Sequence, residues 1–326
     1  MQYQNSNIVE IFILGFQNSE SWNTLCFLLL LVLFCVTLCG NLMIIVVVSY
    51  SRSLHSPMYF FLTQLSALDI VLSTTIVPNM LHIVLNEGSV MSFLGCLTQF
   101  YFFTASESLE CLLLTVMSYD RYQAICNPLH YNSVMDLTFC IKAVLLCWGM
   151  MFAIVLILSI TMTHLWFCGP NIIDHFFCDF DPIVELSCSD SFFIEIEGTI
   201  LAIPLVLCPF LVIMISYVYI IFTILKIPSE TGRQKTFSTC SSHLAVVSIY
   251  YGSIISIYLF PSIKGAKKII SLFYTVVTPL LNPMIYSLNN REIKKAFRKL
   301  MGNSSSAIYI SWFIDRSSLP KNDNTH

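Results

Sequence analysis

Long uncharged apolar segments alternate with short polar ones along almost the whole chain. Seven of them are long enough, at about 1.5 Å per residue, to cross roughly 30 Å of hydrocarbon as helices. These segments lie at approximately residues 24–48, 57–85, 96–124, 138–163, 197–225, 237–261 and 269–290. Helices are expected because an open strand in lipid would leave its backbone amides unpaired. Prolines inside the segments therefore predict kinks rather than helix ends.

Composition leads to the same interpretation. The 326 residues are 56% hydrophobic and 11% charged, whereas soluble domains contain roughly 25% charged residues. This excludes a water-soluble globule and predicts an all-α membrane protein, a seven-transmembrane helix bundle surrounded by lipid. Residues 1–23 lack the basic region of a cleavable signal peptide. No nucleic-acid partner is expected.

Basic residues are distributed unevenly between the polar loops. Lys264, Lys267 and Lys268 lie on the same side as the N-terminus, and the other 13 of the 16 Lys and Arg lie on the opposite side. Because basic loops remain in the cytoplasm, residues 1–23 are predicted to be extracellular and the tail, 302–326, cytoplasmic.

Four of the 13 cysteines fall on the predicted extracellular side: Cys96, Cys168, Cys178 and Cys188. An even number of cysteines in an oxidising compartment predicts two disulfides, although spacing alone leaves all three pairings open. A zinc site that uses His175 and Cys178 is the alternative interpretation.

Three carboxylic acids lie inside apolar segments, where each is costly and therefore a candidate for function. Asp69 and Glu110 are predicted at similar depth, so we expect them to share a sodium ion or a proton. The alternative is that each acid is protonated and hydrogen-bonded to neighbours such as Asn41 and Ser66. Glu107 lies one turn above Glu110. Neither a catalytic group nor a structural metal is predicted.

Arg121 follows Asp120 at the cytoplasmic end of the third segment. This permanently charged group is predicted to be held by Asp120 and released to a partner when helices move. An ordinary interfacial ion pair is the alternative for these two residues alone.

Six sequence blocks resemble those of the vertebrate odorant receptors, within the rhodopsin-like G-protein-coupled receptors. They are GN (40–41), LHSPMYFFL (54–62), MSYDRYQAICNPLHY (117–131), SY (216–217), KTFSTCSSHL (235–244) and PLLNPMIYS (279–287). The resemblance covers roughly residues 8 to 300. The chain departs from the family in lacking the usual N-terminal glycosylation sequon and in carrying Glu107 and Gln123.

The resemblance implies the disulfides Cys96–Cys178 and Cys168–Cys188. It also strengthens a set of switch and coupling residues: Asp120, Arg121, Tyr122, Tyr217, Asn282, Pro283 and Tyr286. For the tyrosines alone, anchoring at the membrane interface is the alternative. Residues 291–301 carry apolar positions at helical spacing between basic ones, which predicts a short amphipathic cytoplasmic helix.

A ligand pocket is expected in the extracellular half of the bundle. Phe103, Thr104, Glu107 and Ser108 share one face of the third segment by their spacing. The resemblance adds Leu201, Leu205, Tyr251, Ile254, Ile255, Tyr258 and Thr275. The expected ligand is small and mostly hydrophobic, and an amine becomes plausible if Glu107 faces the pocket ionised.

The resemblance implies an odorant receptor in the plasma membrane of olfactory sensory cilia, which acts through a heterotrimeric stimulatory G protein to raise cyclic AMP. A transporter would show repeated halves, and an enzyme a nucleophile or metal motif; neither is seen. A non-olfactory chemosensory role in another tissue is the alternative that the sequence leaves open.

Overall fold

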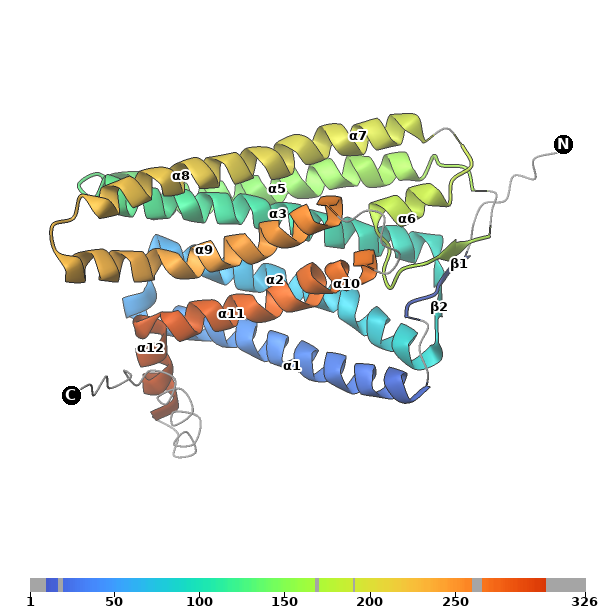
Figure 1. The fold of residues 1–326 in the computed structure, drawn as a ribbon, viewed down its shortest axis with the longest axis horizontal. Coiled ribbons are helices and arrows are strands. Elements are labelled where there is room, and N and C mark those ends of the chain that lie inside the picture. Colours follow the sequence, from blue (N-terminus) through green and yellow to red (C-terminus); the bar gives the residue numbers. More distant parts are fainter. Residues whose placement is uncertain (1–9, 17–19, 168–169, 190, 260–265, 303–326) are drawn as a thin grey trace, which may run out of the picture.

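The computed structural model describes residues 10–16, 20–167, 170–189, 191–259 and 266–302, which form an elongated bundle of long helices (Figure 1). Six segments have the length and apolar composition to cross a membrane. They are α1 (Glu20–Tyr50), α2 (Pro57–Asn86), α3 (Phe93–Cys126), α5 (Leu137–Met162), the continuous α7 (Phe192–Ala202), η2 (Ile203–Leu207) and α8 (Cys208–Leu225), and the continuous α10 (Ala266–Leu272), η3 (Phe273–Val277) and α11 (Thr278–Asn289). The seventh long helix is α9 (Glu230–Leu259), whose first turns are polar. The expected all-α seven-helix membrane fold is confirmed.

The helices pack in an order that follows the chain. α1 contacts α2, α2 contacts α3, and α3 contacts both α5 and α8. α9 lies between α8 and α11, and α11 returns to α1. Because α3 contacts α2, α5, α8 and α9, it is the central helix, and most faces of α3 point to other helices rather than to lipid.

Two helix starts are fixed by side chains that accept a hydrogen bond from the first turn. Ser92 Oγ accepts from the Gly95 backbone nitrogen at 3.1 Å before α3. Asp136 Oδ1 accepts from the Phe139 nitrogen at 2.8 Å before α5. These polar caps set where the apolar segments begin.

The fifth and seventh segments each contain one π-helical turn, η2 and η3. Helical structure continues through Pro204 and Pro209 in the fifth segment and through Pro279 in the seventh. A proline cannot donate a backbone hydrogen bond, and a wider turn accommodates the carbonyl that it leaves unpaired. The prolines therefore distort these helices without ending them.

A three-stranded sheet covers one end of the bundle, which we call the sheet end. Its strands are β1 (Glu10–Ile13), β2 (Ser89–Ser92) and β3 (Ile172–Ile173), in the order β2-β1-β3. β1 pairs antiparallel with β2 and parallel with β3. Ile11 and Ile13 are fully buried beneath the sheet. These strands were not predicted from the sequence.

Gly88 allows β1 to approach β2 closely. Its φ of +140° disfavours other residues, and a Cβ at this position would lie 2.4 Å from the Phe12 ring. The turn that follows α2 therefore requires glycine where the N-terminal strand passes it.

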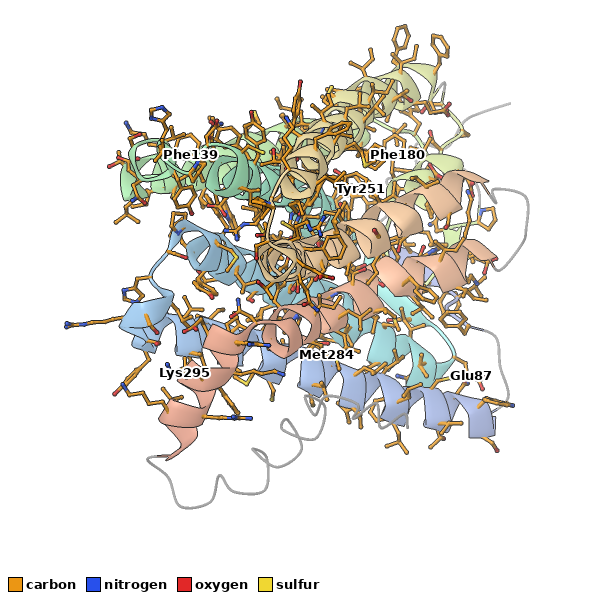
Figure 2. The ribbon with its side chains drawn as sticks, turned by 60° about the vertical axis from the view of Figure 1, so that its left-hand side comes forward. Glu87, Phe139, Phe180, Tyr251, Met284 and Lys295 are labelled. Atoms are coloured by element: carbon orange, nitrogen blue, oxygen red, sulfur yellow. A yellow bond between two sulfur atoms is a disulfide. The ribbon has the colours of Figure 1, made fainter. Side chains whose placement is uncertain are left out.

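The opposite end, which we call the α12 end, carries η1 (Arg52–Leu54), α4 (Tyr131–Val134) and α12 (Arg291–Gly302). α12 runs across the end of the bundle instead of continuing α11 (Figure 1). Asn290 Oδ1 caps α12 by accepting from the backbone nitrogens of Glu292 and Ile293 at 2.9 and 3.1 Å. Ile293 is buried against the bundle. In Figure 2, Phe139 and Lys295 mark this end, and Glu87 and Phe180 mark the sheet end.

Candidate ligand-binding and coupling sites

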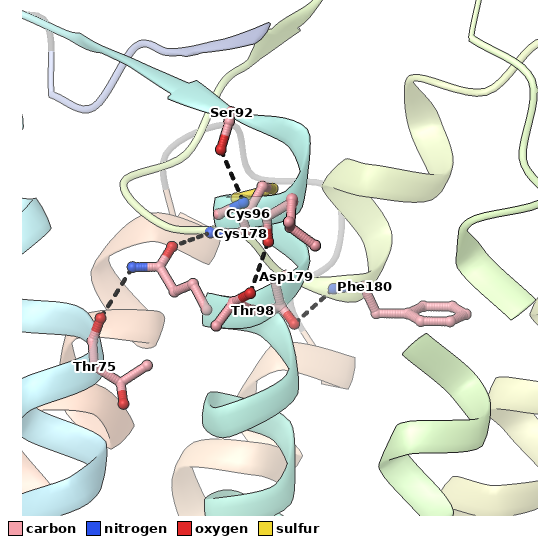
Figure 3. The surroundings of a disulfide bond; sticks show 10 residues. Thr75, Ser92, Cys96, Thr98, Cys178, Asp179 and Phe180 are labelled. Carbon is pink, nitrogen blue, oxygen red and sulfur yellow. Dashed lines mark hydrogen bonds between the residues drawn. A yellow bond between two sulfur atoms is a disulfide. The ribbon is translucent and has the colours of Figure 1, made fainter. Parts of the chain in front are cut away.

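A disulfide ties α3 to the long connection between α5 and α7. Cys96 is bonded to Cys178, as the family resemblance implied (Figure 3). Cys188 is also disulfide-bonded, but its predicted partner, Cys168, lies outside the described residues. The zinc interpretation is wrong, because the Cys178 sulfur is used in the disulfide, and the described residues contain no cluster of three His, Cys, Asp or Glu placed to bind a metal.

Gln99 reinforces this attachment. Its Oε1 accepts from the Cys178 backbone nitrogen at 3.0 Å, and its Nε2 donates to the Thr75 carbonyl at 3.1 Å (Figure 3). One buried side chain on α3 therefore connects α2 to the segment that follows β3.

Two lysines at the start of α10 bind acidic residues of the same connection. Lys268 Nζ lies 2.5 Å from Asp174 Oδ1 and donates to the Gly15 carbonyl at 2.8 Å. Lys267 Nζ lies 3.4 Å from Asp181 Oδ2, and both of these side chains are well exposed. Lys268 is the better buried of the two lysines, and its two bonds join the segment after β1, the connection and α10 at a single point.

Two ionisable groups at the sheet end have shifted pKa values. Burial, followed by the nearby Lys268, lowers the pKa of His175 to about 3. Burial raises the pKa of Asp179 to about 6, although the Phe180 backbone amide donates to its carboxylate at 2.8 Å. Burial favours the neutral form of each group, which moves the two pKa values in opposite directions.

The predicted ligand-binding face of α3 begins at Phe103, directly below the disulfide. The Phe103 ring is buried and packs against Phe177 at 4.7 Å and Tyr274 at 6.0 Å between ring centroids. Thr104, Glu107 and Ser108 follow on α3 and are partly buried. The Glu107 Oε1 atom is itself buried and has no hydrogen-bond partner among the described residues.

The other predicted pocket residues lie at different depths. Tyr251 and Thr275 are buried, and Thr275 Oγ1 donates to the Ser271 carbonyl of its own helix at 2.7 Å. Leu205 and Ile254 are partly buried against the main core. Ile255 is 44% exposed and stands at the edge of this set. The Tyr258 side chain lies outside the described residues.

Leu201 contacts two different parts of the structure. It packs against the apolar cluster at the sheet end and also lines a groove of about 340 Å³ between α5 and α7. Ile154 and Ile200 line the same groove. Leu201 therefore contacts the sheet-end cluster and lines this groove as well.

The two buried acids in the middle of the bundle meet at Asn282. Asn282 Nδ2 lies 3.1 and 3.2 Å from the two carboxylate oxygens of Asp69 and 3.3 Å from Glu110 Oε1. Both acids are 1% exposed. Asn41, the alternative partner, instead donates to the Thr37 and Pro279 carbonyls. Side chains of α2, α3 and α11 thus form one polar cluster, in which the Asn282 amide is the hydrogen-bond donor to both acids.

Arg121 lies at the α12 end and is held by the residue before it. Its guanidinium forms an ion pair with Asp120, and Nε lies 2.9 Å from Asp120 Oδ2. The Tyr131 hydroxyl donates to Asp120 Oδ1 at 2.7 Å. Burial and then the Asp120 charge raise the pKa of Tyr131, so this hydroxyl remains a donor. The Arg121 side chain keeps 11% exposure.

That exposure opens into a cavity of about 570 Å³ at the α12 end. Residues from α2, α3, α9, α11 and α12 line it, including Tyr59, Met117, Arg121, His243, Tyr286 and Arg291. The cavity therefore lies where five helices end, and Arg121 forms part of its wall.

His243 is a functional candidate that the sequence analysis did not single out. Its Nε2 lies 3.1 Å from the Leu114 carbonyl, and its Nδ1 lies 2.7 Å from the Tyr217 hydroxyl. A carbonyl only accepts, so Nε2 carries the proton and Nδ1 accepts from tyrosine. This neutral, buried ring connects α3, α8 and α9. A polar residue inside an apolar segment is the signal that points to it.

The remaining predicted switch residues lie around these elements. Tyr122 stacks near Tyr119 and meets Tyr219 of α8 edge-on. Pro283 packs closely on Gly40, where an added Cβ would lie 3.2 Å from the proline ring. Tyr286 is buried, and its hydroxyl has no partner among the described residues. The structure thus gathers these side chains toward the α12 end.

Comparison with known proteins places this geometry in a family. The family model described as olfactory receptor matches residues 29–304. The chain is 47% identical over 305 residues to human olfactory receptor 11L1, covering 92% of this chain and 95% of that protein. It is 45% identical over 304 residues to human olfactory receptor 6B1, covering 92% and 97% of the two chains. With mouse olfactory receptor 5P60 the identity is 43% over 298 residues, covering 90% and 93%. The chain belongs to the olfactory receptor family, whose members are rhodopsin-like G-protein-coupled receptors and not enzymes.

Proposed function

We propose that this receptor binds small, mostly hydrophobic odorants in the sheet-end half of its bundle and activates a heterotrimeric stimulatory G protein, which raises cyclic AMP. The observation that carries this proposal is the position of Arg121. It lies in the wall of the α12-end cavity, paired with Asp120 but still partly exposed. Membership of the olfactory receptor family supports the odorant as the ligand class.

The sheet end is proposed to be extracellular. Its disulfide fits an oxidising compartment, and most of the Lys and Arg residues lie toward the other end. The cavity at the α12 end would then open to the cytoplasm, where a G protein is available. We place the receptor in the plasma membrane of olfactory sensory cilia, with membrane lipid around the exposed apolar faces of α1, α5 and α8.

The proposed mechanism is a population shift between two helix arrangements. An odorant bound beside α3 favours an arrangement in which the α12-end parts of α8 and α9 move away from α3. The Tyr217–His243–Leu114 connection would break or lengthen in this movement, because it joins those three helices. Release of Arg121 from Asp120 would then complete the surface for the G protein.

The cluster of Asp69, Glu110 and Asn282 is proposed to hold a proton or a sodium ion in the resting arrangement. Two acids that share one amide donor cannot both be ionised at low cost in a buried site. A proton or a cation removes that repulsion. Because the cluster joins α2, α3 and α11, its occupancy would favour the arrangement in which these helices are close.

The test is the cyclic AMP response of cells that express the chain with the olfactory G-protein subunit, screened against a broad panel of volatile compounds. Arg121→Ala is expected to abolish the response at equal surface expression. Arg52→Ala is the matched control, because it removes an exposed arginine at the same end but outside the cavity wall. A full response in Arg121→Ala would contradict the proposed coupling.

A further inference from the structure

Two buried polar atoms of the predicted pocket lack a partner. Glu107 Oε1 and the Tyr251 hydroxyl form no hydrogen bond with any described residue. Leaving such a group unpaired is costly, because burial has removed its hydrogen bonds to water. Native proteins therefore rarely bury polar atoms without a reason, and a bound molecule is one such reason.

The two atoms belong to one layer of the bundle, where α3 meets α9. Tyr250 donates its hydroxyl to the Glu107 carbonyl at 2.8 Å, and it also lies 3.1 Å from Cys111 Sγ. Tyr251 is the next residue, with its ring centroid 5.2 Å from that of Tyr250. Tyr250 is thus engaged by α3, whereas the buried Tyr251 hydroxyl lies near Cys111 in the same layer and makes no hydrogen bond of normal geometry to a described residue.

The Glu107 side chain is only partly buried. Glu107 lies deep among the helices, yet it keeps accessible area, as do Thr104 and Ser108. Accessible area around a residue so far inside indicates an internal gap. One turn nearer the sheet end, the buried rings of Phe103, Phe177 and Tyr274 pack together above this layer.

The charges around the gap favour a donor over an acceptor. Glu110, one turn away, and Asp69 already share the Asn282 amide, so that donor is used. Lys267 and Lys268 are bound to Asp181 and Asp174 at the sheet end. Aromatic faces such as that of Phe103 also attract cations. A carboxylic acid ligand would meet only further carboxylic acids here.

We propose that Glu107 and Tyr251 bind the amino group of a small lipophilic amine. Its ammonium hydrogens would donate to Glu107 Oε1 and to the Tyr251 oxygen, and its hydrocarbon part would lie against the neighbouring apolar side chains. This inference names the ligand class of the pocket and so rests on the proposed function. Alkylamines are protonated at neutral pH, as the lysine side chain is.

The first experiment compares matched ligands in the cyclic AMP assay. Hexylamine, heptylamine, cyclohexylamine and phenethylamine are each tested beside the alcohol of the same skeleton. Glu107→Gln keeps the shape and removes the carboxyl group that would pair with an ammonium, and it is expected to raise the half-maximal concentration for amines about tenfold to a hundredfold. The response to alcohols should change far less. Tyr251→Phe should weaken the amine response about threefold to tenfold.

Matched controls test whether these changes are specific. Glu185→Gln neutralises an exposed acid on α6 (Phe180–Glu185) at the sheet end, and Tyr50→Phe removes an exposed hydroxyl at the end of α1. Both are expected to leave the preference for amines unchanged. If Glu107→Gln affects amines and alcohols equally, or affects neither, the proposal is wrong.

Binding is measured separately from signalling, as the change in melting temperature of the detergent-purified receptor when an amine is added. The wild-type chain should be stabilised by the amines more than by the alcohols, and Glu107→Gln should lose that difference. Equal stabilisation of both chains, or none by any amine, overturns the site. A stabilisation specific for Glu107 without a cyclic AMP response would leave the site standing and would contradict the proposed coupling instead.

Discussion

The two ends of the bundle are held together by different kinds of interaction. At the sheet end, a disulfide, a backbone ladder and ion pairs join segments that are distant in sequence. At the α12 end, side-chain hydrogen bonds around a cavity do so. A disulfide does not break in thermal fluctuations and the hydrogen bonds of a strand ladder open cooperatively, whereas single side-chain hydrogen bonds can exchange one by one. We infer that the sheet end is the fixed end of the bundle and that the α12 end is the rearrangeable end, where helices can change their contacts.

The largest expected effect comes from breaking the fixed end. Replacing Cys178 with serine opens the disulfide, whose cysteines are separated by 82 residues in sequence. Closing a loop of this length stabilises a fold by about 4 kcal/mol, so Cys178→Ser should strongly lower the melting temperature and surface expression. Cys208→Ser, which removes an exposed free thiol, is the control. A Cys178→Ser chain that melts like the wild type would remove the distinction between the two ends.

A smaller effect is expected at the rearrangeable end. His243→Phe removes the bonds to Tyr217 and Leu114 and leaves the buried tyrosine hydroxyl unpaired, at a cost of about 2 kcal/mol. Basal cyclic AMP should rise, because α9 loses one of its connections to α3. His130→Phe alters an exposed histidine at the same end and should change neither quantity. Unchanged basal activity in a destabilised His243→Phe chain would show that the connection is structural only.

The smallest expected effect is the pH dependence of stability at the sheet end, to which His175 and Asp179 contribute with opposite signs. The folded-state pKa of His175, about 3, lies below its ordinary value of 6.5, so stability from His175 is lost as the pH falls below about 6.5. The folded-state pKa of Asp179, about 6, lies above its ordinary 3.8, so stability from Asp179 is lost as the pH rises through 6. From about pH 7 to pH 5 the two effects are roughly 2 kcal/mol lost and 1 kcal/mol gained.

Single variants should therefore have opposite pH slopes. On acidification, the melting temperature of Asp179→Asn should fall more than that of the wild type, and that of His175→Phe should rise. Melting curves at the two pH values measure this directly. Parallel slopes in the two variants would mean that neither group controls the stability of the sheet end in this range.

Much of the fold followed from sequence because it depends on local patterns. Apolar length predicts the helices, and the start expected at about residue 138 lies one residue from the observed start of α5 at Leu137. β1 was not predicted, since Glu10–Ile13 is only four residues long and its partners lie near residues 90 and 172. A local hydrophobic pattern cannot predict pairing between segments so far apart in the sequence.

The site residues also fall into those that the local sequence predicts and those that only the packing reveals. The Asp120–Arg121 pair is local, and the depth of Asp69 and Glu110 can be counted along helices. The roles of Asn282 and His243 as connecting side chains could not be counted, because each depends on how three helices pack. The family resemblance pointed to Asn282, whereas His243 was not singled out from the sequence. Only the packing identified the partners of both side chains.

The central position of β1 in its sheet also constrains the order of folding. β1 lies ahead of every helix that the structure describes, yet β3 follows the end of α5. During synthesis the N-terminal strand therefore has no complete sheet to join until four long helices have been made. A non-local pairing of this kind forms late and slowly. The three-stranded sheet can therefore form only after more than half of the chain has been synthesised, so its formation is a late step in folding.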